Sequence, residues 1–234
     1  DGKVEAIQGA LSGYSSFQGL LLFKNVGLKY HPDVVTVALG YLDMALAWAP
    51  DREHMSDSYA LSVARGLLYK SNLFLVLRKN LLNLTKYRRN KLDATREVNR
   101  VSLESFEENI SGIIALARAA DMQVVLIEMP HNPYAGGFAS HRDPKYVEAL
   151  RQIAARHADS DDVYYLDMYD VFWPARPKDG REEEGSPPSE AMLRKSKEYF
   201  VDDCHMTPVG HRIVAQHLAS LFKTNKIIER ALGR

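Results

Sequence analysis

Short apolar runs separated by longer amphipathic stretches make up most of this chain. Two of the runs, residues 33–39 and 122–129, are rich in Val, Ile and Leu, which is typical of strands buried on both faces of a sheet. Two further short strands are predicted, one near the N-terminus and one at residues 163–166. The four predicted strands are residues 4–8, 33–39, 122–129 and 163–166. Strands that alternate with helices predict a parallel sheet with right-handed crossovers. We therefore expect a doubly wound α/β fold, flavodoxin-like, with three α/β/α layers.

Helical spacing of apolar side chains, together with capping residues, marks the predicted helices. Ser15 and Ser16 are placed to cap a helix that continues to Phe23. Thr207 and Pro208 begin the last helix, since Thr is a good N-cap and Pro suits the first helical position. The other predicted helices cover residues 56–92, 102–120 and 144–157, and an exposed loop is predicted at residues 174–189.

The predicted helix at residues 56–92 becomes basic near its end. The cations there are Arg78, Lys79, Lys86, Arg88, Arg89 and Lys91. A basic amphipathic stretch can bind a membrane surface or an acidic partner, although such a run is more often a solvated helix face. Membrane contact therefore stays open as an interpretation.

Composition limits the class of protein without naming its function. A chain of 234 residues fits one α/β domain with a sizeable core. Thirty basic and thirty acidic side chains cancel, so we expect no nucleic-acid partner. The single cysteine, Cys204, excludes an internal disulfide and leaves the cellular compartment open. No apolar run approaches the roughly 20 residues of a membrane span.

Polar residues and glycines follow the predicted strands, at the edge where ligands bind in open parallel sheets. Gly13, residues 41–43 and His131 each come just after a strand. His131 is a candidate pocket residue, or a loop histidine bonded to backbone. We expect His205, from the last loop, to join them.

Asp202 and His205 stand three residues apart, directly before the last helix. A carboxylate that accepts a hydrogen bond from Nδ1 of an imidazole leaves Nε2 free as a general base. The alternative is that the two residues only cap the helix. A third interpretation, metal ligation by Asp202, Cys204, His205 and His211, lacks zinc-type spacing. We therefore expect no metal and no cofactor.

Three stretches resemble the sequence blocks of the SGNH (GDSL-type) hydrolases, which are esterases, lipases and carbohydrate deacetylases. Asp202 and His205, followed by Thr-Pro-x-Gly-His, resemble the last block. Residues 13–19, with the sequence Gly-Tyr-Ser-Ser-Phe-Gln-Gly, resemble the second. Residues 32–43, which end in Gly-Tyr-Leu-Asp, resemble the strand and the Gly-x-Asn-Asp block that follows it. The resemblance implies His205 as base, Asp202 as its orienting carboxylate and Gly13 as an N–H donor to the oxyanion.

Two parts of the family pattern are missing. No Gly-Asp-Ser block, the source of the nucleophile, occurs in the chain, and Leu42 stands where the family has its oxyanion-hole asparagine. Ser15, Ser16, Ser58 and Ser160 are poor substitutes for the nucleophile, because none has the expected place at the end of the first strand. We expect that first strand to precede residue 1, so that residues 1–234 form a single domain whose first strand is missing.

The sequence therefore favours an SGNH-type ester hydrolase that acts on a small-molecule or glycan ester and lacks its nucleophile in this chain. We expect this chain alone to be inactive. The alternative is a non-catalytic SGNH-like domain that binds an acylated or glycan ligand, which Leu42 and the missing serine both favour. A third interpretation is an interaction module whose basic stretch, residues 78–91, is the functional surface.

Overall fold

Three parallel strands form the central sheet, in the order β1-β4-β5. The computed structural model describes residues 4–47, 49–54, 67–68, 70–77, 80, 98–135, 143–174 and 189–233. The strands of the sheet are β1 (Val34–Val37), β4 (Gln123–Glu128) and β5 (Val163–Asp167). Val34 is paired with Gln123, and Val124 with Val163. A second, antiparallel pair joins β2 (Leu46–Ala47) to β3 (Val98–Asn99) beside the end of β1.

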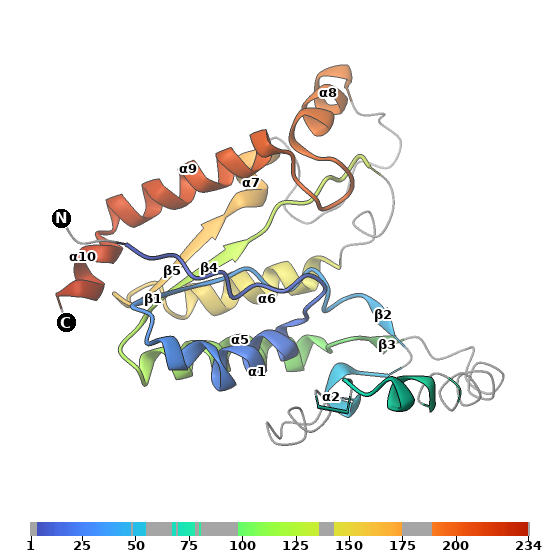
Figure 1. Cartoon of the computed structure of the whole chain (residues 1–234). Helices are drawn as coiled ribbons and strands as arrows, with labels where there is room; N and C mark the ends of the chain where they lie inside the picture. The colour runs from blue at the N-terminus through green and yellow to red at the C-terminus, as the bar shows by residue number, and fades with distance from the viewer. Residues whose placement is uncertain are drawn as a thin grey trace.

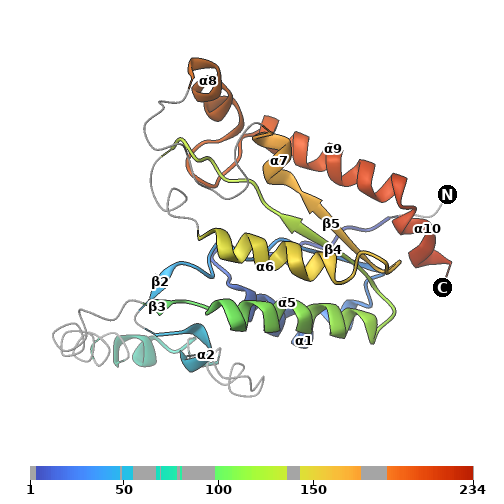
Figure 2. The same ribbon diagram turned by 180° about the vertical axis from the view of Figure 1, so that it is seen from behind.

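Helices cover both faces of the sheet, as Figures 1 and 2 show from opposite sides. One face carries α1 (Ser16–Asn25), α5 (Leu103–Arg118) and α6 (Pro144–Ala155). The other carries α7 (Met168–Phe172), α9 (Pro208–Thr224) and α10 (Ile227–Leu232). The remaining elements are η1 (Gly27–Tyr30), α2 (Asp51–His54) and α8 (Glu190–Tyr199). The layers confirm the predicted three-layer α/β fold.

Strand β4 divides the core into two halves. Every residue of this strand is buried. Val124 and Leu126 pack into the cluster beneath α1, α5 and α6, whereas Val125 and Ile127 pack into the cluster beneath α7, α9 and α10. Successive residues of β4 thus point to opposite faces of the sheet, and helices cover both faces. This explains the continuous apolar run, because neither face of the strand is exposed to water.

The predicted strand at residues 4–8 is wrong. This segment has no regular secondary structure and does not pair with β1. The side chains of Val4 and Ile7 are 72% and 53% exposed. A strand needs a ladder partner and a buried face, and within the described residues this segment has neither.

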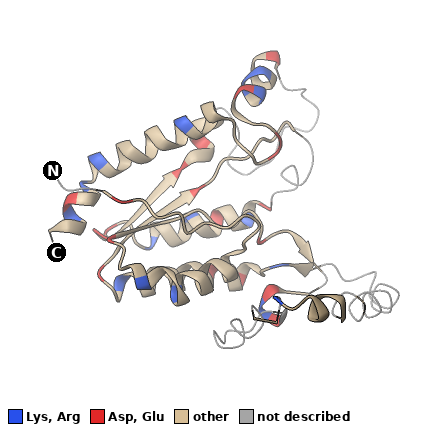
Figure 3. Ribbon diagram, viewed as in Figure 1, with Lys and Arg blue, Asp and Glu red and all other residues tan. Residues whose placement is uncertain are grey.

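The other predicted elements that lie among the described residues are confirmed within two residues. Ser15 forms a capping box with Gln18 at the start of α1, whereas Ser16 is the first helical residue. Most of residues 56–92, including the basic stretch at 78–91, lies outside the described residues, as do residues 175–188 of the predicted loop. None of the described helices has the length and apolar character that a membrane crossing requires. Figure 3 shows acidic and basic residues interspersed over the helices, as the zero net charge suggests.

Gly210 allows the first turn of α9 to pack tightly against the end of α8. A Cβ at this position would overlap the carbonyl oxygen of Tyr199 and would lie 3.1 Å from Cβ of Met206. The neighbouring backbone is fixed, because the Thr207 N–H donates a hydrogen bond to that same carbonyl oxygen at 2.9 Å. The glycine of the Thr-Pro-x-Gly-His pattern therefore has a packing role.

We expect Gly210→Ala to destabilise the chain by about 1–3 kcal/mol, because the added methyl group meets backbone that cannot move away. For a chain of this size the melting temperature should fall by roughly 2–4 °C per kcal/mol. Gly9→Ala is the matched control, since nothing lies within 4 Å of a Cβ there. Thermal unfolding followed by circular dichroism measures both variants, and equal melting temperatures would contradict the packing argument.

Candidate active site

The loop between α8 and α9 is closed at its base by a bridge between Phe200 and Met206. We call residues 202–205 within it the dyad turn. Oδ1 of Asp202 accepts hydrogen bonds from the backbone N–H of Cys204 at 3.0 Å and from that of His205 at 2.7 Å. The Val201 N–H donates to the carbonyl oxygen of His205 at 2.8 Å. The carboxylate is thus oriented by its own turn, as in an Asx-turn.

Asp202 and His205 form the predicted pair. Nδ1 of His205 lies 2.7 Å from Oδ2 of Asp202. Hydrogen bonds from the backbone N–H groups of Cys204 and His205, and then from the imidazole, lower the pKa of Asp202 to about 2. The imidazole is 72% exposed, and its Nε2 binds no group within the described part of the chain. The arrangement leaves a basic nitrogen that faces solvent beside an ionised carboxylate.

Helix capping does not explain the pair. The side chain of Thr207 caps α9, because its Oγ1 accepts a hydrogen bond from the Gly210 N–H at 3.2 Å. Pro208 occupies the first turn, as predicted. Asp202 and His205 instead bind each other and the turn that carries them.

Tyr41 connects the end of β1 to the dyad turn. Its hydroxyl donates a hydrogen bond to Oδ2 of Asp203 at 3.2 Å. Burial and the neighbouring Cys204 and Asp203 raise the pKa of Tyr41 well above its ordinary value, so the phenol stays protonated. Leu42, the next residue, brings no donor to this edge. The hydroxyl of Tyr41 therefore joins the predicted third block to the dyad turn.

Asn132, which sequence reasoning missed, contacts the dyad turn from the end of β4. Its backbone N–H donates to the carbonyl oxygen of Asp203 at 2.8 Å, and its Nδ2 donates to that of Asp202 at 3.2 Å. The only sequence signal was its place between Pro130 and Pro133 after a buried strand.

His131 does not line an open site. Its side chain is buried and stacks on the ring of Tyr169, with centroids 5.0 Å apart. Its carbonyl oxygen accepts a hydrogen bond from Nε1 of Trp173 at 2.8 Å. A buried, stacked imidazole argues against the pocket interpretation.

Gly13 lies in the turn before α1 with a φ of 85°, a conformation that favours glycine. Its carbonyl oxygen accepts a hydrogen bond from Nη1 of Arg100 at 2.9 Å. Its N–H donates no hydrogen bond within the described residues, which leaves it available to a ligand. No hydrogen bond joins Gly13 to the dyad turn in the part of the chain that the structure describes. The proposed oxyanion role of Gly13 stays a prediction.

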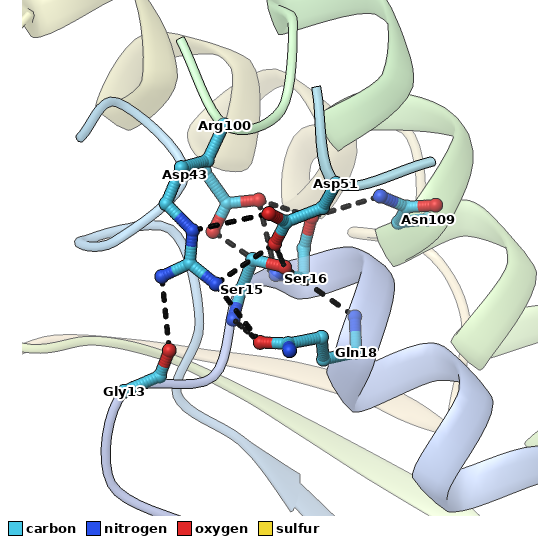
Figure 4. Close-up of polar contacts among 8 residues, drawn as sticks. All are labelled: Gly13, Ser15, Ser16, Gln18, Asp43, Asp51, Arg100 and Asn109. Atoms are coloured by element: carbon cyan, nitrogen blue, oxygen red, sulfur yellow. Dashed lines mark hydrogen bonds and ion pairs between the residues drawn. The ribbon is translucent and has the colours of Figure 1, made fainter. Parts of the chain in front are cut away.

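Ser15 and Ser16 are buried structural residues (Figure 4). Oγ of Ser15 donates to Oδ2 of Asp51 at 2.6 Å, and Arg100 binds that same oxygen at 2.8 Å. Oγ of Ser16 donates to Asp43, and its backbone N–H lies 3.0 and 3.1 Å from the two carboxylate oxygens. A nucleophile must reach a substrate, and neither hydroxyl is exposed. Oγ of Ser160 donates a hydrogen bond to the carbonyl oxygen of His157 at 2.6 Å, in the turn after α6, and Ser58 lies outside the described residues.

The side chains of Asp202, Cys204 and His205 bring three potential metal-ligand atoms within 4.8 Å of one another. Burial, Asp203 and Asp202 raise the pKa of Cys204 to about 11, so the thiol is protonated near neutral pH. The thiolate is the ligand form of cysteine, and the other two side chains are already bound to each other. His211 is not part of this group. The structure thus shows Asp202 and His205 as a hydrogen-bonded pair beside a protonated thiol.

Asp43 makes a testable contribution to stability. Its side chain is fully buried, and burial raises its pKa to about 6 although the bonds from Ser16 and the charge of Arg100 act in the opposite direction. The folded state therefore binds more protons than the unfolded state between about pH 4 and pH 6. This contribution to stability is present below pH 4 and is lost as the pH rises through 6, by at most about 3 kcal/mol.

We expect the free energy of unfolding of Asp43→Asn to lack this pH-dependent decrease. The wild type should therefore become less stable relative to the variant as the pH rises from 4 to 7. Urea unfolding across this range measures the difference. Asp162→Asn is the control: Arg118 lowers the pKa of Asp162, so its difference from the wild type should be constant above about pH 5. A constant difference for Asp43→Asn would mean that Asp43 is already ionised at pH 4.

The sequence blocks and the fold agree with a comparison against known families. The model of the GDSL-like Lipase/Acylhydrolase family matches residues 2–213, which include Gly13, the turn after β1 and the dyad turn. No curated protein matches the chain. Because the match covers nearly the whole chain and the parallel three-layer fold is the one expected, the chain belongs to the GDSL-like lipase/acylhydrolase family of ester hydrolases.

Proposed function

We propose that this chain carries the base and the orienting acid of a serine ester hydrolase, and that the nucleophilic serine comes from residues outside it. The observation that carries the proposal is the 2.7 Å contact between Nδ1 of His205 and Oδ2 of Asp202, made by an imidazole that is mostly exposed. A carboxylate with a pKa near 2 is ionised wherever an imidazole titrates. It can therefore hold the tautomer and stabilise the imidazolium.

In the proposed reaction the serine Oγ bonds to the ester carbonyl carbon while its proton passes to Nε2 of His205. Asp202 stabilises the imidazolium, and the Gly13 N–H donates to the oxyanion. The carbon–oxygen bond to the alcohol then breaks, and the proton on His205 passes to the departing oxygen. Water repeats both steps and releases the acid.

The second candidate is a domain that binds acylated or glycan ligands without turnover. Two observations favour it. Leu42 replaces an amide donor, whose loss typically costs about 10²–10³ in rate. Ser15 and Ser16, the serines beside Gly13, are buried and hydrogen-bonded to Asp51 and Asp43. Binding of an acetylated oligosaccharide by this chain, without release of acetate, would support this candidate.

We expect this chain to hydrolyse short-chain aryl esters barely above background and to resist labelling by a fluorophosphonate probe. Without a serine hydroxyl in reach, His205 could activate only water, which gives weak turnover. Spectrophotometric ester assays and mass spectrometry of the probe-treated chain measure both properties. Robust labelling of Ser15 or Ser16 would show that the nucleophile has been placed wrongly.

A longer chain that includes an upstream strand ending in Gly-Asp-Ser should be labelled, and His205→Ala should abolish the labelling. His217→Ala is the matched control, because His217 lies on α9 and binds only the Ile213 carbonyl among the described residues. Loss of labelling in both variants would argue against a specific role for His205.

In the same longer chain we expect Leu42→Asn to raise kcat by up to 10²–10³, the contribution of one oxyanion donor. The gain should be smaller if a neighbouring group already serves the oxyanion. An unchanged rate in Leu42→Asn would contradict an oxyanion donor at this strand end.

A further inference from the structure

Asn132 binds the main chain of the dyad turn at two successive carbonyl groups. Its backbone N–H donates to the Asp203 carbonyl oxygen at 2.8 Å, and its side-chain Nδ2 donates to the Asp202 carbonyl oxygen at 3.2 Å. These two carbonyls flank the Cα of Asp203 and follow the Cα that carries the Asp202 carboxylate. One residue thus fixes the backbone from which the orienting carboxylate projects.

The other side of the same amide is held just as firmly. Oδ1 of Asn132 accepts hydrogen bonds from Oγ of Ser196 at 2.8 Å and from the backbone N–H of Tyr134 at 3.1 Å. Asn132 as a whole is only 5% exposed, so water does not replace these partners easily. These bonds fix which end of the amide is oxygen, because the hydroxyl and the N–H need an acceptor and the Asp202 carbonyl needs a donor.

The position of Asn132 in the fold connects the exposed loop to the central sheet. Asn132 lies four residues after the end of β4, the strand that pairs on both sides and is buried throughout. The dyad turn is otherwise part of an exposed loop, in which Asp202 and His205 are about half and mostly exposed. The hydrogen bonds of Asn132 therefore link the turn to the segment that follows β4, the buried central strand of the sheet.

We propose that Asn132 is a positioning residue for the Asp202–His205 dyad: its amide sets the dyad turn so that Oδ2 of Asp202 meets Nδ1 of His205. This inference rests on the proposed function for its catalytic meaning, but the geometry exists without turnover. The requirement is for an amide and not merely for size. A carboxylate of the same shape would present an acceptor to the Asp202 carbonyl and a second negative charge to Asp202 itself.

The test is Asn132→Asp, read by NMR on this chain at a pH where the imidazole of His205 is neutral. Long-range ¹H–¹⁵N spectra report which ring nitrogen carries the proton, and backbone amide shifts of Cys204 and His205 report their bonds to Asp202. We expect the wild type to hold the Nδ1–H tautomer. The variant should lose that preference, and both amide resonances should shift upfield.

Asn25→Asp is the matched control. Asn25 also donates from Nδ2 to a backbone carbonyl, that of Leu21 at 2.8 Å, but on α1. It should leave the His205 tautomer and both amide shifts unchanged. Asn132→Ala serves if the buried carboxylate prevents folding, because it removes the donor without adding charge, and it should give the same shifts.

An unaltered tautomer and unaltered amide shifts in a folded Asn132→Asp or Asn132→Ala chain would overturn the proposal. Equal changes in Asn25→Asp would overturn it too, because the effect would then be general destabilisation. The readout needs no esterase activity, so a chain that hydrolyses no ester can still support the role of Asn132. A changed tautomer would likewise leave the proposed function to be tested by the longer chain.

Discussion

The carboxylate of Asp202 is the interaction on which the candidate site depends. One of its oxygens accepts hydrogen bonds from the backbone N–H groups of Cys204 and His205. The other oxygen is hydrogen-bonded to the imidazole of His205. Three hydrogen bonds within four residues make the turn and the dyad a single unit, because the turn that orients the carboxylate also places the histidine. The low pKa of Asp202 follows from this arrangement and not from burial, since the group is exposed. Solvent screening reduces the contribution of such an exposed pair to stability. The position of the turn therefore needs support from residues outside the loop.

That support comes from the ends of two strands. Tyr41, after β1, binds the Asp203 side chain, and Asn132, after β4, binds the main chain of the turn. The sheet can supply rigid anchors because β4 is buried on both faces between the two halves of the core. The edge that carries the candidate site is thus held by a few long-range polar contacts on a well-packed apolar layer, which is the division of roles expected for a site on an α/β sheet.

The sequence predicted the parts of the structure that depend on local chemistry. The apolar runs of β1, β4 and β5, the Thr207 cap and the Asp202–His205 spacing all lie within short windows of the chain. The role of Asn132 was not predictable in this way, since its partner Asp202 lies 70 residues away, and Tyr41 is 162 residues from Asp203. After β4 the sequence drew attention to His131 and not to Asn132, because a histidine carries more recognisable chemistry than the asparagine beside it. The strand at residues 4–8 failed for a related reason: pairing is a property of a partner strand, which a local pattern does not contain.

Leu42 and Asp43 show that two neighbouring residues of one sequence block can differ in role. Leu42 brings no polar side chain to the site, whereas Asp43 makes a structural contact. Asp43 is buried and binds both the backbone and the hydroxyl of Ser16, so it ties the turn after β1 to the start of α1. The Leu42 side chain is not needed for that contact, and its replacement of an amide leaves the turn intact. The dyad is equally independent of a nucleophile, because the described hydrogen bonds that place Asp202 and His205 come from their own loop, from Asn132 and from Tyr41. The presence of the dyad therefore shows that this edge of the fold is formed. Turnover depends in addition on the nucleophile and the oxyanion donors, which are separate parts of the site.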